Sequence, residues 1–339
     1  MEKKSEFVLM HKDISVAMLD HNKLPVQIIT PEHVPYNFVR ANDKCKFYEN
    51  IIDLVLSYCN CNYATPEHTF WIKYKNSPQK YSDVSPYANG KKFIKINDSY
   101  SVVDGKLARR KLCGVSYANA EVIGTIIGES LRIPVAKNFS HGAFVDSQLF
   151  TDENTEMYTQ QDLEHYGTSD KINDKTNDEN NILKPFGKVM QRGVTLQQVK
   201  NMLAQAIPFH SLLGLIDTHK GNLGWLADVN TNKIISHSPF YDFEMSLTIG
   251  DNRWYNNRFI MPCVDNTKYL CKEKFDEMQD AEIDAAGVWD NGKDGLDVAY
   301  PKLYKVLRGA NFDKKYAQKV VDNIKQNAEN LDNFFHGKV

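Results

Sequence analysis

The stretch LLGLIDTHKGNLGW, from Leu212 to Trp225, decides the fold and the chemistry that we expect of this chain. An apolar segment is followed within a few residues by Asp217, His219 and Asn222, after which apolar residues resume. Polar side chains between two apolar runs are typical of a loop that is anchored at both ends. The sequence therefore predicts an anchored loop that carries a carboxylate, an imidazole and an amide.

A second acidic segment follows this loop. Residues 239–247 read PFYDFEMSL, in which Asp242 ends a short predicted strand and Glu244 is a candidate second metal ligand. In phosphoryl transfer from a nucleotide, one carboxylate orients the attacking hydroxyl, while an amide oxygen and another carboxylate hold Mg²⁺. Asp217, Asn222 and Asp242 fit these three roles in that order, and Mn²⁺ is the other divalent ion that hard oxygen ligands would accept. His219 remains open between an imidazole that braces the loop and a proton shuttle.

Two further groups that this chemistry requires occur earlier in the chain. A lysine on a strand holds the nucleotide phosphates, and a glutamate on the following helix holds the lysine. Lys95 lies in the predicted strand FIKI, residues 93–96, and Glu121 lies on the helix predicted for 116–131. Gly124 and Gly128 lower the helix propensity there, which indicates close packing of one helix face against a sheet. We expect Lys95 and Glu121 to form an ion pair at the nucleotide site.

Taken in order, these residues resemble the HipA-like and CtkA-like serine/threonine kinases of the protein-kinase superfamily. LLGLIDTHKGNLGWL resembles the catalytic loop of that family, SPFYDFE its metal-binding strand, and EVIGTIIGESLRIPV the helix that follows its nucleotide-binding strands. The resemblance covers about residues 91–247 and implies an ATP-dependent kinase that transfers the γ-phosphoryl group to a protein Ser or Thr. Autophosphorylation and an antitoxin-like partner are further expectations that the resemblance carries.

The chain departs from the family pattern in two places. Thr218 stands where the family has an arginine, so the loop lacks one forked cation. No glycine-rich loop precedes Lys95, and the segment from Asn97 to Arg110, with Arg109, is a candidate replacement near the phosphates. These departures keep two alternatives open: a catalytically weak pseudokinase that acts as a binding partner, and a small-molecule phosphotransferase.

The expected fold class is α/β (α+β), with a bilobed protein-kinase-like architecture. A hairpin at Phe7 to Ile29 and a helix at Phe47 to Cys59 predict a small N-terminal α+β cap, residues 1–65. A β-rich nucleotide-binding N-lobe should follow at 66–150, in which Thr69 to Tyr74 and Lys91 to Asn97 are two joined strands. Residues 151–181 are acidic and poor in apolar side chains, which predicts a mobile insertion. A mainly helical C-lobe, 182–339, completes the chain.

The overall composition argues against several other classes of protein. The 339 residues include 41 Lys+Arg and 43 Asp+Glu, so there is no basic field for direct nucleic-acid or membrane-surface binding. The 6 cysteines are scattered without a C-x-x-C pair, which favours reduced thiols over disulfides or zinc. No apolar run approaches the roughly 20 residues of a membrane span. We expect a cytoplasmic location, with secretion as an effector left open.

Overall fold

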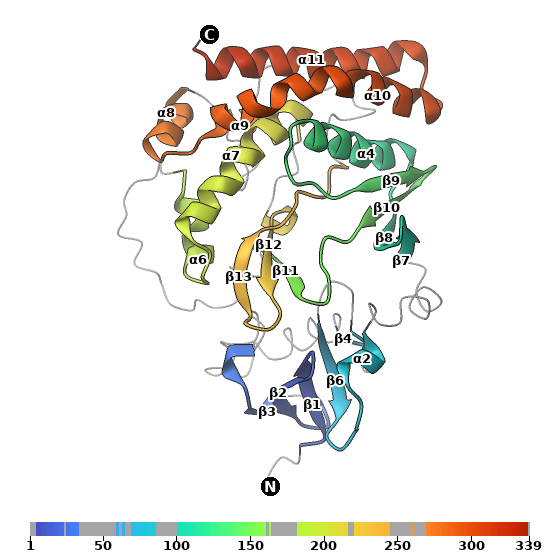
Figure 1. Ribbon diagram of the computed structural model, residues 1–339, viewed down its shortest axis with the longest axis vertical. Helices are drawn as coiled ribbons and strands as arrows, with labels where there is room; N and C mark the ends of the chain where they lie inside the picture. The colour runs from blue at the N-terminus through green and yellow to red at the C-terminus, as the bar shows by residue number, and fades with distance from the viewer. Residues whose placement is uncertain are drawn as a thin grey trace.

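Several small antiparallel sheets and a layer of C-terminal helices make up the chain, as the computed structural model in Figure 1 shows. The structure describes residues 5–23, 25–33, 59–60, 63–64, 69–85, 100–160, 163, 182–215, 220–244, 259–260, 269–270 and 272–337. The predicted cap helix at 47–59 lies almost wholly outside these residues, and so does the predicted strand at 91–97.

A four-stranded sheet in the order β3-β2-β1-β6 forms the end of the molecule that holds the N-terminus (Figure 1). Its strands are β1 (Phe7–His11), β2 (Ile14–Leu19), β3 (Pro25–Ile28) and β6 (Phe70–Tyr74). The predicted hairpin is therefore a three-stranded meander, because Lys12 and Asp13 form an additional turn in which Lys12 has a φ of 50°. Short elements nearby are η1 (Pro31–His33), β4 (Cys59–Asn60), β5 (Tyr63–Ala64) and α2 (Tyr81–Val84).

The strand β6 corrects the predicted boundary between the cap and the N-lobe. Residues 69–74 were expected in the N-lobe, but β6 pairs with β1 in the N-terminal sheet. Apolar side chains explain this pairing, since Trp71 is fully buried in a small core with Val8 and Met10. The N-terminal sheet thus recruits a strand from beyond residue 65.

A second sheet, in the order β7-β8-β10-β9, lies beside a long helix. The strands are β7 (Tyr100–Val103), β8 (Lys106–Leu112), β9 (Asn138–His141) and β10 (Phe144–Gln148), and the helix is α4 (Val115–Ser130). The helix predicted for 116–131 is confirmed. Its two glycines are close-packing positions, because a Cβ atom on Gly124 would lie 2.2 Å from Phe243 and one on Gly128 would lie 2.2 Å from Val135.

The third sheet, β11-β12-β13, occupies the centre of the molecule (Figure 1). It consists of β11 (Thr155–Thr159), β12 (Gly224–Asp228) and β13 (Lys233–His237). Residues 155–159 of the predicted insertion form the strand β11, which pairs with β12 along its whole length. Glu156 is fully buried on this strand and accepts a hydrogen bond from the Thr69 hydroxyl at 3.1 Å. Residues 161–162 and 164–181 lie outside the described part of the chain.

Helices dominate the remainder of the described chain. They are η3 (Lys184–Phe186), α6 (Gly187–Met190), α7 (Leu196–Leu213), η4 (Lys220–Asn222), α8 (Lys272–Asp280), α9 (Ala285–Gly292), η6 (Lys293–Gly295), α10 (Leu296–Gly309) and α11 (Lys314–Phe335), with the short pair β14 (Phe259–Ile260) and β15 (Tyr269–Leu270) before α8. The predicted closing helix is confirmed as α11. One apolar core joins α4, α7 and α11, so the predicted nucleotide-side helix and the C-terminal helices share a rigid support. Among the described helices, none has the length and apolar character to cross a bilayer.

Candidate active site

The predicted catalytic loop lies between α7 and β12. Thr195 starts α7 with a capping box, and Gly214 ends it in the left-handed conformation at a φ of 59°. Asp217 and His219 lie outside the described residues, so their positions remain predictions. Asn222 is described, at the end of η4, and only 9% of its surface is exposed. The loop is therefore held on both sides by regular structure, as its apolar flanks predicted.

The predicted metal-binding strand is not a regular strand, because only Phe240 forms an isolated bridge among residues 238–244. This metal-binding segment runs alongside the chain segment that follows α4. Phe240 forms a parallel bridge with Val135, and its backbone N–H donates to the Pro134 carbonyl at 2.9 Å. The Tyr241 hydroxyl donates to the Gly221 carbonyl at 2.9 Å, which joins this segment to the second half of the catalytic loop. The two motifs that the sequence placed in one site are thus connected by a direct hydrogen bond.

Asp242 itself has an unusual backbone. Its φ is 63°, in the left-handed region that few residues other than glycine adopt. The next residue, Phe243, is fully buried and packs on Gly124 of α4. A larger residue at position 124 would push Phe243 away, so the glycine permits the backbone course that presents Asp242. Strained backbone that packing holds in place is common at functional sites.

Glu121 is buried beside this segment. Only 2% of its surface is exposed, and Asn138 Nδ2 donates to its Oε2 at 3.3 Å. Burial raises the pKa of Glu121 to about 8, although a hydrogen bond from the Phe243 backbone N–H acts in the opposite direction. The proximity of the Asp242 carboxylate raises the pKa further. The predicted partner Lys95 lies outside the described residues, so the ion pair between the two remains a prediction.

Lys111 on β8 contacts the metal-binding segment, and the sequence analysis did not predict this contact. Its Nζ lies 3.1 Å from Asp242 Oδ1 and 2.8 Å from Glu244 Oε2. Burial alone would lower the pKa of Lys111, but its bonds to Glu244 and Asp242 outweigh burial and raise it. The run Arg109-Arg110-Lys111 was the one hint of an inward-facing cation in the sequence. Successive strand residues point to opposite faces, so at least one of these three cations had to face into the protein.

The arginine beside Lys111 has a different partner. Arg110 binds Asp146 of β10 through two hydrogen bonds, at 2.8 Å and 2.7 Å. The hydrogen bonds from Arg110 hold the pKa of the buried Asp146 carboxyl below its usual value. The segment that the sequence offered as a candidate near the phosphates therefore ends in an arginine that is paired inside the sheet.

Three acidic side chains lie close enough together that they could hold a divalent cation. Glu121, Asp242 and Glu244 each offer an oxygen, and these oxygens lie within 4.8 Å of one another. Carboxylate oxygens are the ligands that Mg²⁺ and Mn²⁺ prefer. The donor set thus fits the predicted ion and supports the earlier expectation that Glu244 joins Asp242 as a ligand.

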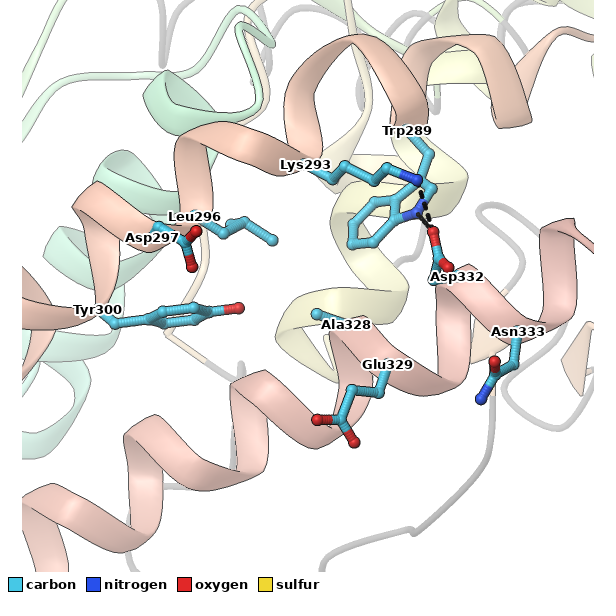
Figure 2. A pocket seen from close by; sticks show the side chains of 9 residues that line it. All are labelled: Trp289, Lys293, Leu296, Asp297, Tyr300, Ala328, Glu329, Asp332 and Asn333. Carbon is cyan, nitrogen blue, oxygen red and sulfur yellow. Dashed lines mark hydrogen bonds and ion pairs between the residues drawn. The ribbon is translucent and has the colours of Figure 1, made fainter.

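A pocket between α9, α10 and α11 contains none of the candidate residues (Figure 2). Lys293 Nζ lies 2.7 Å from Asp332 Oδ1, and Trp289 Nε1 donates to the same oxygen at 3.2 Å. Lys293 also binds Asp290 at 2.7 Å. These interactions link α9 and η6 to α11, so the polar groups here brace neighbouring helices.

Comparison with known proteins identifies the fold. No protein-family model matches the chain, and no curated protein sequence matches it. Among solved structures, the Helicobacter pylori proinflammatory kinase CtkA matches with a TM-score of 0.52 and 15% identity, over 70% of this chain and 90% of that chain. HipA of Shewanella oneidensis MR-1, in a complex with HipB and operator DNA, matches with a TM-score of 0.45 and 10% identity, over 96% of each chain. The chain thus has the fold of the kinase CtkA, and the resemblance to CtkA-like kinases predicted from the sequence is confirmed at the level of the fold.

Proposed function

We propose that this protein is an ATP-dependent kinase that transfers the γ-phosphoryl group to a serine or threonine hydroxyl of a protein. The observation that carries the proposal is the pair of carboxylates Asp242 and Glu244 with the buried Glu121 beside them, on a CtkA-like fold and next to the second half of the predicted catalytic loop. Neither the fold nor the cluster would be sufficient alone, because folds host many functions and acidic clusters are common on proteins. Their coincidence at the predicted positions supports phosphoryl transfer.

Each proposed residue has a defined role in the reaction. Asp217 accepts a hydrogen bond from the attacking hydroxyl and takes its proton as the new O–P bond forms and the bond to the β-phosphate oxygen breaks. Asn222 and Asp242 would hold Mg²⁺, with Glu244 as an additional ligand. Lys95 binds the phosphates with Glu121 behind it, and His219 braces the loop. When bound, Mg²⁺ neutralises charge that develops on the transferring phosphate.

Incubation of the purified protein with ATP labelled at the γ-phosphate tests the proposal. Label should appear on the protein itself or on generic protein substrates. Asp217→Ala should reduce the rate by about a hundredfold or more, since general base catalysis contributes about 10² to 10⁴. Asp322→Ala, which removes an exposed carboxylate on α11, is the matched control and should retain the parent rate.

Three outcomes separate the alternatives. Activity of Asp217→Ala within about threefold of the parent, a barrier change of about 0.7 kcal/mol, would contradict the catalytic role. Binding of ATP without any transfer would favour the pseudokinase that acts as a binding partner. Transfer of label to small alcohols but never to protein would favour a small-molecule phosphotransferase.

A further inference from the structure

The side chain of Lys111 lies where a divalent cation would bind. Its ammonium contacts Asp242 at 3.1 Å and Glu244 at 2.8 Å, and these are two of the three carboxylates that could hold a metal. Glu121, the third, has an oxygen within 4.8 Å of theirs. A single lysine therefore serves as the counter-ion for carboxylates that the proposed reaction assigns to a metal.

Lys111 and a metal ion cannot share these oxygens in the same geometry. Mg²⁺ requires near-octahedral coordination at about 2.0–2.1 Å and usually retains several waters. An ammonium within hydrogen-bond distance of both carboxylates occupies part of that coordination sphere, and two cations a few ångströms apart repel each other. Binding of the metal ion through Asp242 Oδ1 and Glu244 Oε2 would therefore displace the ammonium from at least one carboxylate.

The displaced ammonium of Lys111 can move toward solvent or toward a bound phosphate. The Lys111 side chain is 41% exposed, so its four-carbon stem can move without leaving a cavity in the core. It extends from β8, which precedes the helix that carries Glu121. A nucleotide phosphate bound by the metal ion would bring new anionic acceptors into its reach, and charge-assisted hydrogen bonds to phosphate are strong.

We propose that Lys111 is a positioning residue that neutralises the metal-binding carboxylates before nucleotide binds and moves to a nucleotide phosphate afterwards. This inference rests on the proposed function, since it takes the nucleotide and metal site from it. Lys111 then has two opposite effects on binding at the site. Lys111 weakens the binding of the bare metal ion, and it strengthens the binding of the metal–nucleotide complex.

The test is the binding of Mn²⁺ alone, followed by electron paramagnetic resonance, in the parent and in Lys111→Met. The dissociation constant should fall by about tenfold or more in the variant, which corresponds to about 1.4 kcal/mol. Lys137→Met is the matched control, because Lys137 faces a single exposed carboxylate, Glu129, at 3.7 Å. The control should bind Mn²⁺ like the parent.

Titration with ATP at saturating Mn²⁺ is the second arm. Lys111→Met should now bind about tenfold more weakly than the parent, the reverse of its effect on the bare ion. Lys111→Arg keeps the charge and should resemble the parent in the first arm. Lys111→Gln supplies a second neutral variant in case Lys111→Met does not fold, which circular dichroism would reveal.

The outcomes distinguish failure of this inference from failure of the proposed function. Unchanged or weaker Mn²⁺ binding in Lys111→Met and Lys111→Gln overturns the role of Lys111. If Asp242→Asn still abolishes Mn²⁺ binding in that case, the metal site of the proposed function stands. If no variant and no parent protein binds Mn²⁺, with or without ATP, both the inference and the proposed metal site fall.

Discussion

Two clusters in this molecule have nearly the same ionic composition. In the candidate active site, Lys111 lies between Asp242 and Glu244, at 3.1 Å and 2.8 Å. Between the C-terminal helices, Lys293 lies between Asp290 and Asp332, at 2.7 Å from each. Figure 2 shows its contact with Asp332. Each cluster also offers three side chains that could hold a metal ion, with His336 as the third member of the helical one.

The clusters differ in burial and in backbone conformation. The first contains Glu121, which is 2% exposed with a raised pKa, and Asp242, whose φ is 63°. In the second, Lys293 lowers the pKa of Asp290 and Asp332, as expected for ion pairs near solvent. Ionic composition alone therefore does not mark a functional site. A carboxylate kept out of water and a backbone held in a costly conformation are the distinguishing features.

The largest expected difference between the clusters is in activity. Asp242→Asn should lower phosphoryl transfer by about a hundredfold or more, because it removes a metal ligand from the reaction centre. Asp332→Asn should leave the rate within about threefold and cost about 1 kcal/mol of stability, the usual value of exposed ion pairs and single hydrogen bonds. Initial rates at saturating Mg²⁺ and urea denaturation provide both values. Equal rate losses in Asp242→Asn and Asp332→Asn would contradict the assignment of activity to the first cluster alone.

The strained backbone at Asp242 should depend on Gly124. Gly124→Ala places a methyl group 2.2 Å from the Phe243 ring and should destabilise the protein by about 1–2 kcal/mol through overpacking. Gly309→Ala on α10 is the matched control, since no atom lies within 4 Å of its added methyl group. The control should be neutral or stabilising by up to about 1 kcal/mol. A Gly124→Ala variant as stable as the parent would show that Phe243 can move away from the added methyl group at little cost in stability.

The two clusters should also respond to pH with opposite sign. The pKa of Glu121 is raised from 4.5 to about 8, so between these values the folded protein binds a proton that the unfolded chain releases. The free energy of unfolding contributed by Glu121 therefore falls as pH rises, by at most about 1.4 kcal/mol per pH unit. In Glu121→Gln this slope should disappear, as urea denaturation at pH 5 and pH 8 would reveal. If the free energy of unfolding of the parent and of Glu121→Gln changed with pH in parallel, the assignment of this pH dependence to Glu121 would be contradicted.

The helical cluster supplies the control for this pH dependence. The pKa of Asp332 is lowered from 3.8, chiefly by its hydrogen bond from Lys293. Its contribution to stability is therefore present above pH 3.8 and is lost as the pH falls below that value. The difference in stability between the parent and Asp332→Asn should shrink in acid, while the difference for Glu121→Gln should grow toward pH 8.

The local patterns predicted the helices and the packing at α4. The spacing of apolar residues identified α4 and α11, and Gly124 and Gly128 marked the close contacts that the structure contains. These features depend on residues near one another in the sequence, where periodicity and propensity act directly.

Features that depend on distant partners were missed. The acidic composition around β11 concealed a strand whose buried Glu156 binds His11 and Thr69 of the N-terminal sheet. A buried carboxylate is tolerated only with such partners, and no local pattern reveals them. For Lys111 the sequence shows only a basic run. It does not show which side chains Lys111 contacts, because Asp242 and Glu244 lie far from it in the chain.

Calorimetric titration of ATP with and without Mg²⁺ tests the proposed nucleotide–metal site most directly. The parent should bind ATP at least about tenfold more tightly with the ion than without it, and Asp242→Asn should lose most of this difference. Asp332→Asn should keep it in full. Equal affinity with and without Mg²⁺ in the parent, or no binding of ATP under either condition, would contradict the proposal that this site transfers phosphoryl groups.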